Sequence, residues 1–199
     1  MYSVGLIGGV ASGKTTVSQV FADLGAEIIS ADLIAKQLTA LDQPAYKVIV
    51  QHLGQEILMP TMELDRRLLR DKMLDDVCVR SWLEALLHPL IRQSMQNMQK
   101  NSLAAYVILE IPLLKNKQDY PYLKRVLWVK SSPEQQLQRL MDRDQVSRSQ
   151  AEKMISCQLD HSLLESLADD VLSNTDNVQG LSENIHALHQ KYLNLSGFQ

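Results

Sequence analysis

A glycine-rich segment near the amino terminus carries the clearest chemical signal in the sequence. Residues 8–15, GGVASGKT, fit the phosphate-binding pattern G-x-x-x-x-G-K-[ST] at every fixed position. Gly8 and Gly13 permit backbone angles and a close approach that a Cβ would forbid, so successive N–H groups can face phosphate oxygens. Lys14 would place an ammonium group on the β- and γ-phosphates, and the Thr15 hydroxyl could bind Mg²⁺. The residues expected to bind ATP here are Gly9, Val10, Ala11, Ser12, Gly13, Lys14, Thr15 and Thr16.

The alternative is that this segment is only a tight turn between a strand and a helix. An apolar run at residues 3–7 leads straight into the glycines, and Val17, Val20, Phe21 and Leu24 follow at helical spacing. This strand–loop–helix context is the one in which the motif binds phosphate, so it favours phosphate binding over the plain turn.

Asp32 directly follows a second apolar run, at residues 26–31. Ligands of an open parallel sheet bind beyond the carboxyl ends of its strands, so this carboxylate could orient an attacking hydroxyl or help to hold Mg²⁺. It could equally cap a helix that begins at Leu33. Position alone leaves both interpretations open.

Arg139 and Arg143 lie four residues apart on an expected helix and therefore share one face. Paired guanidinium groups suit the charged phosphates of a transition state. Asp142 and Asp144 support the alternative, a solvated charged face, and for these arginines taken alone that alternative is favoured.

Further basic residues fall in the middle of the chain, where they could receive an anionic acceptor. A solvated face, or a structural hydrogen bond in the case of the histidine, is the alternative for each of them. These residues are Arg66, Arg67, Arg70, Lys72, His88 and Arg92.

The elements that must position these residues alternate between strand and helix. The expected strands are residues 3–7, 26–31, 106–111, 126–129 and 170–172. Such alternation predicts an α/β fold with a parallel sheet covered by helices on both sides.

The stretch between the second and third expected strands follows helical spacing and is interpreted as a helical insert. Gly54 is expected to close one helix, Asp65 to cap another, and Pro89 to interrupt a third. Later in the chain, Ser132 with Pro133 predicts a helix start, and a helix from Ser147 to about residue 159 is expected as well.

Composition and charge exclude several classes of protein. The 199 residues are 45% hydrophobic and 22% charged, an ordinary globular composition that excludes disorder for most of the chain. The net charge of −3 gives no electrostatic footprint for nucleic acid. No signal peptide or membrane helix is recognised, so the sequence predicts a cytoplasmic protein without a membrane partner. Cys78 and Cys157 have neither disulfide nor zinc spacing.

Taken in order along nearly the whole chain, these segments resemble the dephospho-CoA kinase family. The matching segments are GLIGGVASGKTTV at 5–17, FADLGAEIISADLIAKQ at 21–37, LDRRLLR at 64–70, LLHPLIR at 86–92, PLL at 112–114, QLQRLMDRD at 136–144 and LADDVLSN at 167–174. The phosphate-binding loop alone would indicate only the superfamily, whereas the ordered set is specific.

The resemblance implies a single P-loop kinase domain over residues 1–199, with a three-layer fold and a five-stranded parallel sheet. It also implies an acceptor-binding helical insert at about 33–104 and a small lid at about 143–158. ATP, with Mg²⁺, would donate its γ-phosphoryl group to the ribose 3′-hydroxyl of dephospho-CoA. These two small molecules are the expected partners of a monomer or weak homo-oligomer.

The resemblance also assigns roles to individual residues. Asp32, Lys14 and Arg139 would be catalytic, and Arg139, Arg143 and Asn174 would complete the ATP site. The residues implied to bind the acceptor are Asp32, Arg66, Arg70, His88, Arg92, Pro112, Leu113 and Leu114.

The sequence departs from the family pattern at a few positions. Ser30 stands where the family usually has an aspartate two residues before Asp32, so a role for that first acid is lost. Lys115 and Asn116 follow the PLL motif in place of an apolar residue and a glutamate, and Glu110 stands where an aspartate is common.

Two other functions compete with this one. Another P-loop kinase acting on a nucleoside, nucleotide or small alcohol would share the phosphate chemistry and differ in its acceptor. A nucleotide-binding protein without an acceptor would not explain Asp32 together with the arginine-bearing helix. A GTPase would carry an N-K-x-D motif, which the sequence lacks.

Overall fold

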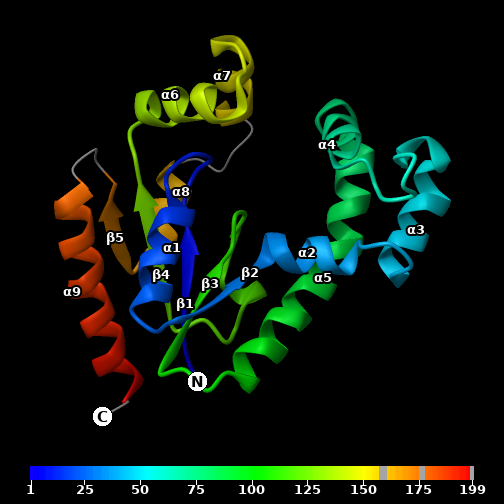
Figure 1. The fold of residues 1–199 in the computed structure, drawn as a ribbon. Coiled ribbons are helices and arrows are strands. Elements are labelled where there is room, and N and C mark those ends of the chain that lie inside the picture. The colour runs from blue at the N-terminus through cyan, green and yellow to red at the C-terminus, as the bar shows by residue number, and fades with distance from the viewer. Residues whose placement is uncertain (157–160, 175–177, 198–199) are drawn as a thin grey trace. The chain divides into compact units, whose positions relative to one another are not determined.

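The computed structural model of the chain describes residues 1–156, 161–174 and 178–197. The chain divides into two compact units, whose elements are labelled in Figure 1. The core unit comprises Met1–Ser30 and Met98–Gln199, and the helical unit comprises Ala31–Asn97.

Within the described residues, the core unit is built on a five-stranded parallel sheet with the strand order β2-β3-β1-β4-β5. The strands are β1 (Tyr2–Ile7), β2 (Glu27–Ser30), β3 (Tyr106–Glu110), β4 (Arg125–Lys130) and β5 (Asp170–Ser173). Each end of all five agrees with the expected strand to within one residue, which confirms the predicted parallel sheet. Because β1 is the central strand, the glycine-rich loop that follows it emerges at the middle of the carboxyl edge.

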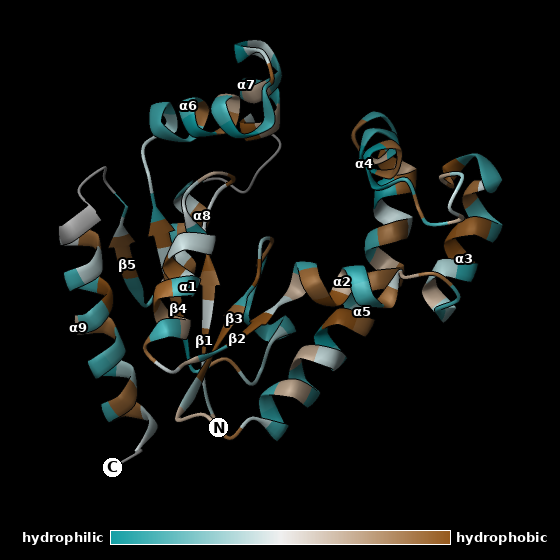
Figure 2. Cartoon of the chain, viewed as in Figure 1, coloured by the Kyte–Doolittle hydropathy of each residue, from teal (hydrophilic) through white to brown (hydrophobic). Residues whose placement is uncertain are grey.

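Helices cover both faces of this sheet, as its apolar strands require (Figure 2). The helices of the core unit are α1 (Lys14–Asp23), α6 (Pro133–Asp144), α7 (Arg148–Ser156), α8 (His161–Leu167) and α9 (Val178–Ser196), with a 3₁₀ turn, η2, at Lys117–Asp119. Phe21 of α1 and Tyr192 of α9 pack with Leu127 and Val129 on one face. Trp128 lies between those two strand residues and meets the ring of His161 in α8, at 5.7 Å between ring centroids.

An ion cluster ties the last strand to its neighbours at the amino edge of the sheet. Asp170, at the start of β5, accepts hydrogen bonds from Arg125 Nε at 2.8 Å and from the Tyr192 hydroxyl at 3.1 Å, and it pairs with Lys191. Burial acts to raise the pKa of Asp170, but the bonds from Arg125 and Lys191 prevail and hold that pKa below its ordinary value. The second aspartate of the LADDVLSN segment therefore has a structural role.

The helical unit contains a small core of its own. Its elements are α2 (Ala31–Leu38), α3 (Pro44–Leu53), a 3₁₀ turn η1 (Gln55–Ile57), α4 (Arg66–Asp75) and most of α5 (Val77–Asn101). Tyr46, Ile49, Ile57, Leu69 and Leu83 form the buried cluster. This core holds the helices around the loop that connects η1 to α4.

Most local predictions in the helical stretches are confirmed. Gly54 ends α3 with a φ of 85°, and the Asp65 carboxylate accepts the backbone N–H groups of Arg67 and Leu68 at the start of α4. In the core unit, Ser132 and Gln135 form the expected capping box of α6.

The predicted interruption at Pro89 is wrong. The helix α5 continues from Val77 to Asn101 with Pro89 inside it. A proline removes one backbone hydrogen bond, but buried side chains on both sides of it, Leu83 and Met95, anchor the two halves of the helix. The helix expected from Ser147 is described from Arg148 to Ser156, and its expected end near residue 159 lies outside the described residues.

None of the helices in the described part of the chain combines the length and apolar character needed to cross a bilayer. Cys78 is a free, exposed thiol, and Cys157 lies outside the described residues.

Candidate active site

The loop between β1 and α1 holds the lysine of the phosphate-binding motif in place. The Nζ atom of Lys14 donates hydrogen bonds to the carbonyl oxygens of Gly8 at 2.6 Å and Gly9 at 2.8 Å. The ammonium group is therefore folded over the backbone of its own loop. In this position it supplies positive charge where the loop and the amino end of α1 turn their N–H groups outward.

Both fixed glycines of the motif are required by their surroundings. A Cβ on Gly8 would lie 2.7 Å from the Val129 carbonyl oxygen and 2.8 Å from the Ser12 Oγ. Gly13 has a φ of +92°, and a Cβ there would overlap the side-chain amide of Asn174. The loop is thus packed tightly between β4 and the residue that follows β5.

Asn174 is bound to the phosphate-binding loop itself. Its Nδ2 donates to the Ser12 carbonyl oxygen at 2.7 Å, and its backbone N–H donates to the Lys130 carbonyl oxygen at 2.7 Å. Ser12 and Asn174 are both buried. The side chain therefore joins the end of β5 to the loop, a role that the sequence pattern alone did not suggest.

An alanine at position 174 is expected to weaken the loop before any nucleotide is present. Asn174→Ala leaves the buried Ser12 carbonyl without its donor, at a cost of about 1–3 kcal/mol. We expect a lower melting temperature of the nucleotide-free protein and a KM for ATP raised about tenfold. Ser173→Ala, at the adjacent exposed position on β5, is the matched control.

Melting curves and ATP titrations of the two variants measure both effects. If Asn174 acted only by touching ATP, the melting temperature of the nucleotide-free Asn174→Ala protein would equal that of the control. That result would contradict the structural role.

Arg139 lies against the same loop. Its Nη1 atom is buried and lies 4.0 Å from the position that a Cβ on Gly13 would take. Arg143, one turn further along α6, instead binds the Asp144 carboxylate through Nε at 2.7 Å, and this bond raises the pKa of Arg143. Of the two arginines expected to cover the phosphates, the structure thus places one beside the loop and the other in an exposed pair.

An apolar contact between the loop and the α6–α7 hairpin was missed by sequence reasoning. Leu137, Leu140 and Ala151 form a small buried cluster, and Val10 and Ala11 pack against it. Leucines spaced three apart on α6 were the available signal. Two variable positions of the phosphate-binding motif, Val10 and Ala11, therefore provide the apolar contact between the loop and the α6–α7 hairpin.

The residues around the motif provide a suitable oxygen for a divalent cation. Thr15 lies in the first turn of α1 with an exposed side chain. A hydroxyl is a hard oxygen ligand, and Mg²⁺ takes few protein ligands beside phosphate and water oxygens. The donor set thus fits a cation that arrives with a nucleotide. Within the described residues, no three His, Cys, Asp or Glu side chains are grouped to hold a metal ion by themselves.

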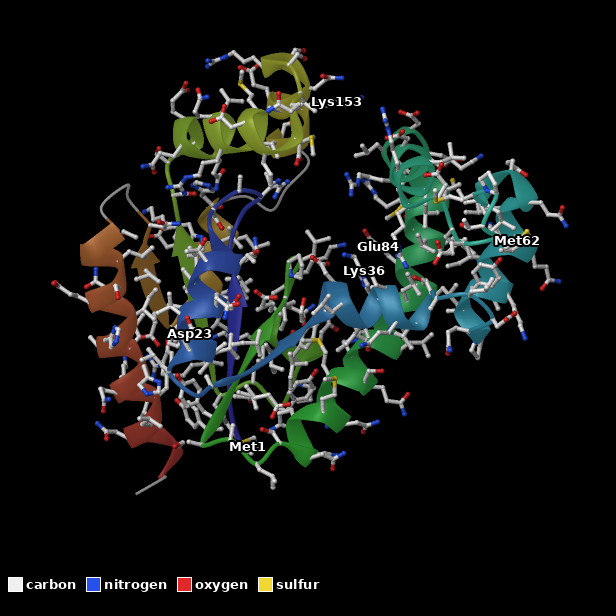
Figure 3. All side chains as sticks on the ribbon, in the orientation of Figure 1. Met1, Asp23, Lys36, Met62, Glu84 and Lys153 are labelled. Carbon is white, nitrogen blue, oxygen red and sulfur yellow. The ribbon has the colours of Figure 1, made fainter. Side chains whose placement is uncertain are left out.

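Asp32 lies inside the first turn of α2, in the helical unit, and its side chain is exposed. The helix begins at Ala31, two residues before the expected start at Leu33, so Asp32 does not occupy the flanking position that a capping residue takes. Lys36 follows it by one turn and is exposed as well (Figure 3). The capping alternative is therefore not supported by the helix boundary.

The other expected acceptor residues divide between the two units. In the helical unit, Arg66 and Arg70 are exposed at the start of α4, and His88 and Arg92 are half-buried on α5. In the core unit, the segment after β3 has Pro112 half-buried, Leu113 exposed and Leu114 fully buried. No one of these residues identifies an acceptor by itself.

Comparison with known proteins gives a consistent result. A family model described as dephospho-CoA kinase matches residues 2–180. A Legionella pneumophila (strain Lens) protein named dephospho-CoA kinase is 42% identical over 193 residues, which cover 97% of this chain and 96% of that protein. A protein of the same name from Escherichia coli (strain K12) is 38% identical over 195 residues, covering 98% and 95% of the two chains.

Solved structures agree with these relatives. A Thermus thermophilus crystal structure superposes with a TM-score of 0.79 at 26% identity, covering 96% of this chain and 97% of the other. A structure named dephospho-CoA kinase from Campylobacter jejuni gives a TM-score of 0.67 at 25% identity, covering 95% and 96%. A shikimate kinase from Acinetobacter baumannii, at 17% identity and a TM-score of 0.56, shares the fold.

Proposed function

Because the chain belongs to the dephospho-CoA kinase family, we propose that it transfers the γ-phosphoryl group of ATP to the ribose 3′-hydroxyl of dephospho-CoA, giving ADP and CoA. The observation that carries this proposal is the intact phosphate-binding loop, with Lys14 held over the Gly8 and Gly9 carbonyls, in a chain that matches the family over residues 2–180. The loop and the family match support each other, because the loop indicates phosphoryl transfer and the family indicates dephospho-CoA as the acceptor.

The loop residues would act mainly by position and charge. Phosphoryl transfer passes through a loose transition state, so the enzyme has little covalent chemistry to perform and stabilises charge on the phosphate oxygens. The backbone N–H groups of residues 9–16 would hold the β- and γ-phosphates, and Lys14 would bind oxygens between them. Arg139, already beside Gly13, would add a second positive charge. Arg143 would have to leave Asp144 to reach phosphate.

The cation of the ATP complex belongs to the same proposal. We infer that it is Mg²⁺ and that the Thr15 hydroxyl is its protein ligand, which fits the exposed place of that side chain. When bound, Mg²⁺ would neutralise negative charge on the β- and γ-oxygens.

Asp32 is proposed to orient the acceptor hydroxyl. Only Ala31 separates it from the carboxyl end of β2, and its carboxylate is exposed. Further residues are proposed to bind the acceptor. Those proposed are Arg66, Arg70, His88 and Arg92 in the helical unit and Pro112, Leu113 and Leu114 in the core unit.

The roles of the helical insert and of the lid are likewise part of the proposal. A helical insert at about 33–104 would receive the acceptor, and a lid at about 143–158 would close over ATP. The end of that lid, at residues 157–158, lies outside the described residues. The apolar packing of α6 and α7 against Val10 and Ala11 supports the lid assignment, because it places the hairpin in direct contact with the phosphate-binding loop. A monomeric or weakly oligomeric state and a cytoplasmic location stay predictions of the sequence.

One acceptor comparison tests the function. Dephospho-CoA, AMP and adenosine are each supplied with MgATP while ADP release is followed in a coupled assay. Binding energy from the remote parts of the full acceptor can position the hydroxyl, so dephospho-CoA should exceed both truncated acceptors in kcat as well as in kcat/KM. Equal or better kcat/KM with AMP or adenosine would instead establish a nucleotide or nucleoside kinase.

A further inference from the structure

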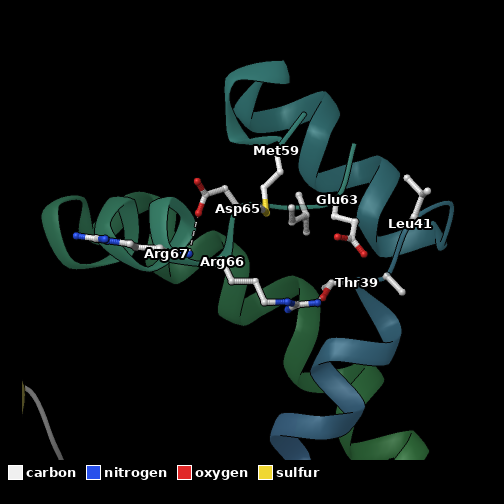
Figure 4. Close-up of a pocket in the computed structure, with 9 residues that line it drawn as sticks. Thr39, Leu41, Met59, Glu63, Asp65, Arg66 and Arg67 are labelled. Carbon is white, nitrogen blue, oxygen red and sulfur yellow. Dashed lines mark hydrogen bonds between the residues drawn. The ribbon is translucent and has the colours of Figure 1, made fainter. Parts of the chain in front are cut away.

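A cavity of about 400 Å³ lies wholly within the helical unit, and Arg66 is the one lining residue already proposed to bind the acceptor (Figure 4). It opens between the end of α2, the loop before α4 and the start of α4. Thr39, Leu41, Met59, Glu63 and Arg66 are among the residues that line it. Its volume falls within the range of small-molecule sites.

One side of the cavity is apolar and open to solvent. Leu41 and Met59 are each 45% exposed, and the buried Leu64 also lines the cavity. Methionine adapts its shape to flexible apolar ligands, and large apolar side chains that gather in a concave surface are typical of binding sites. This side therefore suits a flexible, partly apolar chain.

The other side offers a cation. Arg66 extends toward Thr39 and donates to the Thr39 hydroxyl and to the Lys36 carbonyl oxygen, at 3.3 Å in each case (Figure 4). Both acceptors are neutral, and among the described residues no carboxylate forms an ion pair with Arg66. A guanidinium has five N–H donors, so several remain for an anion.

The two carboxylates of the cavity are engaged locally. Asp65 accepts the backbone N–H groups of Arg67 and Leu68 at 3.0 Å as the cap of α4, and Glu63 accepts from the Thr61 hydroxyl at 3.2 Å. The Arg67 side chain extends away from the cavity (Figure 4). Among the described lining residues, Arg66 thus directs its guanidinium along the cavity, while the Glu63 carboxylate can still accept an amide N–H.

The helix α2 connects this cavity to the proposed hydroxyl-orienting residue. Asp32 and Lys36 are four residues apart on α2, and Thr39 directly follows the helix with its backbone N–H still bound to the Ala35 carbonyl oxygen, so the three side chains follow one face. Seven residues of helix rise by about 10 Å. An acceptor lying along this face would have its ribose at Asp32, an anionic group near Lys36 and Arg66, and a further arm at the cavity.

We propose that this cavity binds the pantetheine arm of dephospho-CoA, with Lys36 and Arg66 holding the adjoining pyrophosphate. The inference rests on the proposed function and names the part of the acceptor that the cavity selects. The arm fits the chemistry of the lining: it is flexible, it carries a dimethyl group for Leu41 and Met59, and it has amide N–H groups for Glu63.

Methionine-methyl NMR on the full chain tests the placement directly. The probe is 4′-phosphopantetheine, which has the phosphate and the arm but no adenosine. Its addition should shift the methyl signal of Met59 and leave that of Met62 unchanged. Met62 lies in the same loop with a similarly exposed side chain but does not line the cavity. An Arg66→Gln protein should bind phosphopantetheine about tenfold more weakly, because a charge-assisted bond to phosphate is lost.

Kinetics with two acceptors test the same placement by an independent measurement. Met59→Ala should lower the ratio of kcat/KM for dephospho-CoA to kcat/KM for AMP about tenfold, since only the longer acceptor has an arm. Met62→Ala is the matched control and should keep the wild-type ratio. The cavity assignment would be overturned if Met59→Ala kept the wild-type ratio of the two kcat/KM values and phosphopantetheine did not shift the Met59 methyl signal of the wild-type protein. Turnover of dephospho-CoA by the wild-type protein would still uphold the proposed function in that case. A wild-type protein that did not phosphorylate dephospho-CoA would overturn both.

Discussion

Replacing Lys14 by alanine is expected to lower kcat by about 10²-fold or more, on the scale of removing one preorganised electrostatic group. The ammonium group that now binds the Gly8 and Gly9 carbonyls would be absent, while the backbone N–H groups of the loop remain. In the transition state charge shifts onto the oxygen that bridges the β- and γ-phosphates, so the loss there should exceed the loss of ATP binding in the ground state. The variant should therefore show a larger fall in kcat than in ATP affinity.

Steady-state kinetics with MgATP and dephospho-CoA, together with an ATP titration, separate the two effects. Lys100→Ala is a charge-matched control, because Lys100 is exposed near the end of α5, which leads to the amino edge of the sheet. Its kcat should stay at the wild-type value. Near-normal turnover of the Lys14→Ala protein would show that the loop does not hold the reacting nucleotide.

The sheet and the loop could be predicted from sequence because local signals determine them. Apolar runs of four to six residues, broken by glycines and by helix caps such as Ser132, mark strands and helix starts without any long-range information. The phosphate-binding loop is recognised for the same reason, since its glycines and Lys14 lie within eight residues.

Contacts between distant segments could not be predicted in this way. Asn174 and Ser12 are separated by 162 residues, and nothing in either local sequence indicates that an amide will meet that carbonyl. The packing of Val10 and Ala11 against α6 depends on the same kind of long-range placement. Pro89 shows the reverse case, in which a strong local signal for a helix break is overridden by tertiary packing.

The cavity of the helical unit could not be predicted from the sequence either. Arg66 stands out in the sequence as one of several basic residues, but its neighbours Leu41 and Met59 carry no pattern that links them to it. Only the fold of α2, the following loop and α4 brings the Arg66 guanidinium, bound to the Thr39 hydroxyl, and exposed apolar side chains to one cavity. The acceptor class came from the ordered family segments, whereas the selection of its arm requires the three-dimensional arrangement.

Asp32→Asn is expected to fold normally and bind ATP normally while kcat falls by about 10²- to 10⁴-fold, on the scale of general acid–base catalysis. Asparagine keeps the shape of the side chain and one acceptor oxygen but loses the negative charge. A carboxylate is a weak base for a ribose hydroxyl, and a loose transition state needs little early proton removal. The charge would thus act chiefly by orienting the hydroxyl and by accepting its proton late in the reaction.

A purely structural Asp32 predicts a different result from the same variant. Inside the first turn of a helix a carboxylate adds at most about 1 kcal/mol through the helix dipole, so kcat would hardly change in the asparagine variant if Asp32 only stabilised α2. Asp23→Asn, at an exposed position on α1 where the carboxylate accepts from Gln19, controls for the loss of one surface charge. Melting temperature, ATP affinity and kcat are measured for both variants. Asp32 lies inside the first turn of α2, so its catalytic role requires a steep fall in kcat together with a nearly unchanged melting temperature. A retained kcat in Asp32→Asn would instead show that Asp32 is not the carboxylate that orients the hydroxyl.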